Sequence, residues 1–383
     1  MRIENSTLII SPGRYSVIIL HGFTDLTVLM VNSACWNGSR IIFRQLSPEA
    51  EDIYDLIISL HQSCSGDWKT LGQKAGVPEQ DVNHFLDYAA QFLGNGGNYK
   101  GFGDSKFLPR ISSENLEKLT STDEKANGIY KKLNGAIYSG VDNPSLLHLG
   151  YPDQGHLSNY YLGNTITQQE IEAISKTIAK AGILPENTRV RKVKDTEFEL
   201  LIASGIDNPP SEDIDSKDGK KSLDINEDGV KGIINLKFGD YREEMAKIAL
   251  EMKTAGKYAA NDGQRTMIEQ YAKSFGTGSL NAFKKSQEAW VKDIGPMVES
   301  NIGFIETYRD PAGVRAEWEG FGEYCMNKLL GHQANGDIQW QWSTKNVPEL
   351  LGLWSLQLRN SYHCFHGVAH MKRINSRLQI SHL

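Results

Sequence analysis

Cysteine is scarce in this sequence, and no strongly basic stretch is present. The four cysteines, Cys35, Cys64, Cys325 and Cys364, are widely scattered and match no disulfide framework. This usage favours reduced thiols and a cytoplasmic location. The formal net charge is −6, and no run of Lys or Arg is long enough to bind a polyanion. We therefore expect no nucleic-acid partner.

Long apolar runs are also missing. The stretch Ser16–Val31 comes nearest to one, but His21, Thr24 and Asp25 interrupt it. The stretch is too short to span a bilayer, and no clean small-residue cleavage site follows it. We expect neither a signal peptide nor a membrane anchor, and therefore no membrane partner.

The composition suits a folded chain with a sizeable core, because 39% of the 383 residues are hydrophobic and 23% are charged. Apolar positions recur at helical spacing after Pro48 and after Pro78. By contrast, Arg189–Lys194 and Glu197–Ala203 have the pattern of two strands in a hairpin. No internal repeat is visible. The pattern predicts an α+β fold, with mixed helices around a small β-sheet or a partly closed barrel.

Several helix starts have local sequence signals. Ser47, followed by a proline, can cap the first of these helices. Thr167 and Glu170 form a capping box before another apolar stripe. Asp240 and Ser279 are the expected caps of two later helices. Each of these predictions rests on residues within four positions of one another.

Residues 205–231 are acidic and rich in Pro, Ser and Gly, so we expect an acidic surface insert that forms a mobile loop. Within it, Asp224–Gly229 matches the first six positions of an EF-hand calcium loop. Asn235 stands at position twelve, where the loop needs a bidentate Glu, and Lys231 stands at the usual apolar eighth position. An acidic loop accounts for this segment better than a calcium site does.

The stretch Gly303–Phe321 concentrates charged side chains around a Pro-Ala-Gly turn. Glu306 precedes the turn, and Glu317 and Glu319 follow it. Carboxylates this close in sequence can hold a cation, either a substrate ammonium or an arginine of the chain itself. The alternative is a buried Arg–Glu network that only braces the turn. Spacing alone leaves both interpretations open.

The same stretch resembles the substrate-anchoring segment of the dipeptidyl peptidase III family, whose members are zinc exopeptidases. Further blocks resemble the family in the same order, so that the likeness covers residues 32–322. These blocks are Trp36–Arg40, Arg44–Glu49, Gln91–Asn95, Asn98–Phe107 and Tyr151–His156. The resemblance implies that residues 32–322 form the peptide-binding, non-zinc lobe of a two-lobed metallopeptidase.

The resemblance also implies a function and a partner. Family members release dipeptides from short peptides with a free N-terminus, so such peptides are the implied substrates. Glu306 and Glu319 would grip the substrate ammonium, Thr307 would lie along the peptide backbone, and Tyr308 would hydrogen-bond the peptide and help hold the scissile carbonyl. A monomer is expected. The remaining charged residues would brace the site; these are Arg309, Asp310, Arg315 and Glu317.

Zinc is the cofactor that the resemblance implies, but its ligands are not present in this sequence. In the family, a His-Glu-x-x-Gly-His sequence supplies two ligands and the general base. None of the ten histidines here precedes a glutamate. Leu329–His332 resembles the end of that sequence, yet Asn327 and Lys328 occupy the places of the first His and the Glu. We therefore name no catalytic residue and no metal ligand, and expect this chain to be inactive alone.

The two ends, residues 1–31 and 323–383, match no part of the family. We expect them to come from a mis-joined reading of a longer coding sequence, with the helical zinc lobe missing. The tail could bind a metal by chance through His363, Cys364, His366 and His370.

Three alternatives to a working peptidase stay open. The chain could be a non-catalytic peptide-binding module or a truncated fragment without function. The third alternative is a hydrolase, because Val17–Leu20 followed by His21-Gly22 resembles the oxyanion-hole loop of α/β-hydrolases. That class also needs a Gly-x-Ser-x-Gly elbow, which the sequence lacks.

Overall fold

The computed structural model describes residues 7–9, 18–20, 23–101, 104–133, 135–293 and 298–324. The chain folds into two compact units. The mixed unit contains the described residues up to Ser39, Glu172–Glu306 and 315–324. The helical unit contains Arg40–Ile171 and Thr307–Val314. Helix α1 (Phe23–Leu46) belongs in part to each unit, and it follows a short antiparallel pair, β1 (Thr7–Ile9) and β2 (Ile18–Leu20).

The helical unit is built around the apolar stripes that the sequence predicts. Ile53, Leu56 and Leu60 are fully buried, and Phe43 stacks on Phe92 with ring centroids 5.3 Å apart. The elements of this unit are α2 (Ala50–Cys64), α3 (Trp68–Ala75), α4 (Glu79–Asn95), α5 (Ser113–Thr120), α6 (Glu124–Leu133), three short 3-10 helices (Ala136–Tyr138, Pro144–Leu147 and Pro152–Gln154) and strand β3 (Tyr161–Gly163).

The predicted Ser47 cap is wrong. Helix α2 begins at Ala50 with Glu49 at its cap position, and the Glu49 side chain makes no capping hydrogen bond. The Ser47 hydroxyl donates instead to Asn98 Oδ1 at 2.9 Å, in the buried interior of the unit. A buried amide oxygen needs a donor, and this tertiary partner takes the hydroxyl that a local cap would have used.

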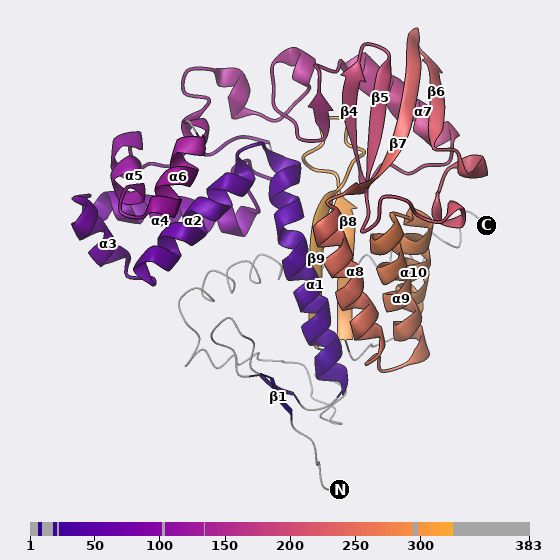
Figure 1. Ribbon diagram of the computed structural model, residues 1–383, viewed down its shortest axis with the longest axis horizontal. Coiled ribbons are helices and arrows are strands. Elements are labelled where there is room, and N and C mark those ends of the chain that lie inside the picture. The colour runs from indigo at the N-terminus through magenta and orange to yellow at the C-terminus, as the bar shows by residue number, and fades with distance from the viewer. Residues whose placement is uncertain are drawn as a thin grey trace, which may run out of the picture. The chain divides into compact units, whose positions relative to one another are not determined.

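The mixed unit contains a twisted sheet and a helical layer (Figure 1). In the sheet, β4 (Thr188–Lys194), β5 (Glu197–Ala203), β7 (Val230–Asp240) and β6 (Ser222–Glu227) are neighbours in that order. The β4–β5 pair is antiparallel, which confirms the predicted hairpin. Strands β5 and β7 are parallel. Helix α7 (Gln168–Lys180) starts at the predicted capping box: Glu170 N donates to Thr167 Oγ1 at 3.2 Å, and Thr167 N donates to Glu170 Oε2 at 2.8 Å.

The helical layer of this unit consists of α8 (Arg242–Gly256), α9 (Asp262–Thr277) and α10 (Leu280–Lys292), which lie side by side. The Ser279 cap of α10 is confirmed, because its side chain accepts from Ala282 N at 3.2 Å. After α10, β8 (Val298–Glu306) and β9 (Glu317–Tyr324) form an antiparallel hairpin.

The predicted Asp240 cap is also wrong. Asp240 ends strand β7, and α8 begins only after Tyr241, whose φ of 54° is left-handed. The Asp240 carboxylate pairs instead with Arg189, which donates from Nε at 2.7 Å and from Nη2 at 2.6 Å. Such a two-point contact with a cation binds a carboxylate more strongly than a backbone N–H does.

The insert over residues 205–231 is more ordered than a mobile loop. Its second half contains β6, which pairs antiparallel with β7. In its first half, Asp213 is 7% exposed and Ile214 is 6% exposed. An acidic composition predicts a mobile loop. Composition cannot show, however, which of the acidic side chains form contacts that order the chain. The observed elements confirm an α+β fold with a small mixed sheet. No helix within the described ranges has the length and apolar character that crossing a bilayer demands.

Candidate functional site

The register of the β8–β9 hairpin decides which acidic side chains share a face. Glu306 pairs with Glu317, Phe304 with Trp318, and Gly303 with Glu319, with an irregularity between Phe304 and Glu306. Directly paired residues of an antiparallel hairpin point to the same side, and successive residues alternate. The register therefore brings Glu306, Glu317 and Glu319 to one face.

The opposite face of the hairpin packs into the mixed unit. The Trp318 indole meets Phe304 edge-on at a centroid distance of 5.3 Å and Phe275 of α9 at 5.2 Å. Trp318 is 1% exposed. The acidic face is also packed where Gly303, the register partner of Glu319, lies against the Phe283 ring of α10. Of the acidic residues, Glu306 and Glu319 are half-buried, whereas Glu317 is buried.

The turn that follows Glu306, Thr307–Val314, belongs to the helical unit. Its Tyr308 is 44% exposed. Asp310 organises the turn: one oxygen accepts from Tyr161 Oη at 2.6 Å and from Ala312 N at 3.1 Å, and the other accepts from Val314 N at 3.0 Å. The sequence shows no sign of the Tyr161 contact, which spans 149 positions.

Arg309 anchors the same turn to the last residue of α4. Its Nη2 donates to the Asn95 carbonyl at 2.7 Å, and the residue is 6% exposed. These contacts support the bracing roles expected of Arg309 and Asp310. Arg315 is 0% exposed, which agrees with a structural position. The structure thus places Glu306 and Glu319 on one face in the mixed unit, and Thr307 and Tyr308 in the helical unit.

A buried ion pair lies beside the glycine-rich segment that follows α4, residues 96–101, and sequence reasoning missed it. Lys106 Nζ contacts Glu49 Oε1 at 2.8 Å, the Ala136 carbonyl at 2.8 Å and Ser139 Oγ at 2.6 Å. Asn98 donates to the same Glu49 oxygen at 2.9 Å. A buried charge is tolerated when it is paired and hydrogen-bonded in this way. The pairing spans 57 positions, so no local pattern indicates it.

Burial raises the pKa of two carboxyl groups, those of Asp104 and Glu186. For Asp104, the charge of the nearby Arg309 partly opposes this rise in pKa. Burial also raises the pKa of Glu186 in the mixed unit, partly opposed by a backbone hydrogen bond and by the charge of Lys284. The backbone carbonyl of Glu186 accepts from Ala316 N at 2.9 Å, next to the start of β9.

The described residues do not fit a zinc centre. Within them, no three His, Cys, Asp or Glu side chains are grouped to hold a metal ion. In the calcium-like segment, Asp228 pairs with Lys176 at 2.5 Å and Glu227 pairs with Lys180 at 2.6 Å, so lysines already neutralise these carboxylates. The other candidates lie outside the described residues: Leu329–His332, the tail residues His363, Cys364, His366 and His370, and the hydrolase-like His21-Gly22.

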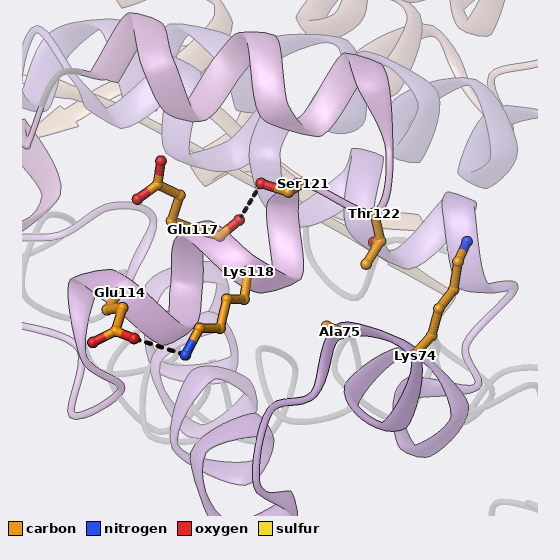
Figure 2. Close-up of a pocket in the computed structure, with 7 residues that line it drawn as sticks. All are labelled: Lys74, Ala75, Glu114, Glu117, Lys118, Ser121 and Thr122. Atoms are coloured by element: carbon orange, nitrogen blue, oxygen red, sulfur yellow. Dashed lines mark hydrogen bonds and ion pairs between the residues drawn. The ribbon is translucent and has the colours of Figure 1, made fainter.

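A shallow pocket of about 470 Å³ lies on the helical unit, between α3 and α5 (Figure 2). Its rim includes the ion pair of Glu114 and Lys118, 2.7 Å apart, and Lys74 from the facing helix. None of the predicted site residues lines it. The acidic face of the hairpin therefore remains the candidate site within the mixed unit.

Comparisons with known proteins agree with the resemblance. Residues 129–330 match the sequence profile of peptidase family M49. The chain is 40% identical over 293 residues to dipeptidyl peptidase 3 of Dictyostelium discoideum, and 35% identical over 305 residues to dipeptidyl peptidase 3 of Homo sapiens. Each match covers 76% of this chain and 40% of the relative, so the chain spans well under half the length of these proteins.

A solved structure of DPP III from Caldithrix abyssi superposes on 78% of this chain and 39% of its own, with a TM-score of 0.39 and 14% identity. That superposition is too loose to support an argument about the site. The profile match and the identity to the curated relatives carry the assignment: this chain belongs to peptidase family M49.

Proposed function

We propose that this chain supplies the peptide-anchoring part of a dipeptidyl peptidase III. In that role it holds the free N-terminus of a short peptide, so that the bond after the second residue is the one to be cut. The observation that carries the proposal is the shared face of Glu306 and Glu319 on the β8–β9 hairpin. The relatives that match the chain are named for dipeptidyl peptidase activity.

The chemistry of the hairpin suits an ammonium group. A peptide α-amino group has a pKa of about 7.7–8.0 and is largely cationic at neutral pH. Two half-buried carboxylates on one face can accept its N–H donors in charge-assisted hydrogen bonds. Tyr308, two residues beyond Glu306 in the chain and 44% exposed, offers a hydroxyl to the peptide backbone.

Cleavage needs more than this chain offers. Zinc, when bound, would supply a water molecule acidic enough to attack a peptide carbonyl at neutral pH. The sequence has no His-Glu pair to supply ligands and a general base. We propose that the chain by itself binds peptides and does not hydrolyse them, and that its ten histidines form no hydrolytic zinc site.

The finer points of the assignment are part of the same proposal. Residues 32–322 would form the peptide-binding lobe, with the acidic insert 205–231 inside it, and residues 1–31 and 323–383 would lie outside it. Cys35 and Cys64 are free thiols in the structure, which supports a cytoplasmic location. We also propose that the chain acts as a monomer.

Calorimetry with a synthetic tetrapeptide tests the proposal. The full chain should bind a tetrapeptide with a free N-terminus, and binding should vanish for the N-acetylated peptide, which has no ammonium group. Glu306→Gln and Glu319→Gln should each weaken binding about tenfold or more, because each replaces a charged acceptor of the ammonium with a neutral amide oxygen. Glu288→Gln makes the same charge change at an exposed site on α10 and should leave affinity unchanged.

Equal binding of the free and acetylated peptides would reject the ammonium clamp. No binding at all would favour a fragment without function. Tight binding without dipeptide release, with or without added zinc, would identify a non-catalytic peptide-binding module. Dipeptide release by the purified chain, lost on chelation, would contradict the proposal that it is inactive alone.

A further inference from the structure

The acidic insert contacts the corner between α9 and α10 through two carboxylates. Asp213 forms an ion pair with Lys273 of α9 at 2.6 Å. Asp215 accepts three hydrogen bonds at the start of α10, from Ser279 Oγ at 2.8 Å, Leu280 N at 2.5 Å and Asn281 N at 3.2 Å. The insert therefore grips both helices where they meet.

The Asp215 contacts replace much of the capping that an isolated helix would need. The first N–H groups of a helix have no partner inside it, and the helix dipole favours a negative charge there. Ser279 already caps Ala282 N, and Asp215 takes two of the other free N–H groups. The start of α10 is thus held by a residue more than sixty positions away.

Each of the two helices holds one strand of the hairpin. The Phe275 ring of α9 contacts Trp318 of β9, with centroids 5.2 Å apart. In α10, the Phe283 ring lies so close to Gly303 of β8 that a Cβ there would fall 2.6 Å from it. Gly303 is the register partner of Glu319 and lies three residues before Glu306. The α9–α10 corner therefore backs both of the strands that carry these carboxylates.

A second contact ties the far end of α10 to β8. Trp290 Nε1 donates to Glu299 Oε1 at 2.5 Å. Helix α10 is consequently in contact with β8 near both of its ends, through Phe283 and Trp290, and is held by the insert at its start. A shift of its first turn would tilt the Phe283 ring against the Gly303 backbone, because a packed interface transmits small displacements.

From these contacts we infer that Asp213 and Asp215 are positioning residues for the Glu306–Glu319 clamp. The inference rests on the proposed function for its effect on peptide binding. Neither residue touches the peptide. They fix the α9–α10 corner, and the corner fixes the two strands that carry the clamp.

Two measurements on the full chain test this inference, at a temperature where every variant is folded by circular dichroism. Asp215→Ala should weaken binding of the free tetrapeptide about three- to tenfold, as expected for a residue coupled to a site through packing. It should also speed hydrogen exchange in 298–306 and 317–324. Lys273→Ala, a milder change at an exposed side chain, should shift both readouts in the same direction.

Two matched variants separate positioning from general stability. Glu212→Ala removes a neighbouring, exposed carboxylate of the same insert and should change neither readout. Asn261→Ala removes the cap at the opposite end of α9, where its side chain accepts from Gln264 N at 2.7 Å. It should lower the melting temperature without changing peptide affinity.

The inference fails if Asp215→Ala binds peptide like the wild type with unchanged hairpin exchange. It also fails if Asn261→Ala loses as much affinity as Asp215→Ala. If Asp215→Ala does not fold, Asp215→Asn and Lys273→Ala decide by the same criteria. If the wild type binds no tetrapeptide, the proposed function fails, and hairpin exchange alone decides the positioning role.

Discussion

The Trp318 indole of β9 lies directly on Gly38 of α1: a Cβ at position 38 would stand 2.0 Å from the indole nitrogen. Gly38 belongs to one of the blocks that resemble the dipeptidyl peptidase III family. In the structure, its lack of a side chain lets the helix and the hairpin approach each other closely within the mixed unit.

Gly38→Ala should therefore destabilise the mixed unit. The added methyl would overpack the contact with Trp318, and overpacking costs about 1–3 kcal/mol. Urea unfolding followed by tryptophan fluorescence measures the change. Gly276→Ala in α9 is the control: its Cβ would make only an ordinary contact at 3.8 Å, so the variant should be neutral or slightly stabilised. Equal midpoints for the two variants would contradict this prediction.

Lys106→Met should destabilise the helical unit by about 3–5 kcal/mol, because it leaves the Glu49 carboxylate buried without its charge partner. Chemical denaturation followed by circular dichroism gives the free energy of unfolding. Lys118→Met, which breaks the exposed pair with Glu114, should have no measurable effect. A Lys106→Met protein as stable as the wild type would show that the Lys106–Glu49 ion pair does not contribute to stability.

Glu186→Gln should raise the melting temperature near pH 7, and the gain should fade in acid. Burial raises the pKa of Glu186 above its ordinary value of 4.5. Below pH 4.5, folded and unfolded states both hold the proton, so the charge costs nothing. As the pH rises through the folded-state pKa, the wild type loses stability and the Gln variant does not. Melting curves from pH 4 to pH 8 measure the difference; a gain independent of pH would contradict it.

Tyr308→Phe should weaken binding of the free tetrapeptide about three- to tenfold, because one neutral hydrogen bond to the peptide is lost. Tyr308 is 44% exposed, so the melting temperature should stay the same. Calorimetry gives the affinity and circular dichroism the melting temperature. Unchanged affinity would remove Tyr308 from the site, while Glu306 and Glu319 would be unaffected by that result.

Some features of this protein follow from the sequence alone. The Thr167–Glu170 capping box, the Ser279 cap and the β4–β5 hairpin all form as predicted. Their signals work because the interacting groups lie within a few residues of one another, where the backbone geometry of a helix or a turn is almost independent of the rest of the chain. The family could also be identified from the sequence, since its motifs occur as ordered blocks.

Tertiary structure decided the rest. Ser47 and Asp240 have the sequence features of caps, but Asn98 and Arg189 bind them instead. The shared face of Glu306 and Glu319 depends on the register of β8 and β9, and the insert is ordered by partners on α9 and α10. A polar side chain takes the partner that best compensates its burial, and that partner can be any distance away in sequence. Only the folded chain shows which one it is.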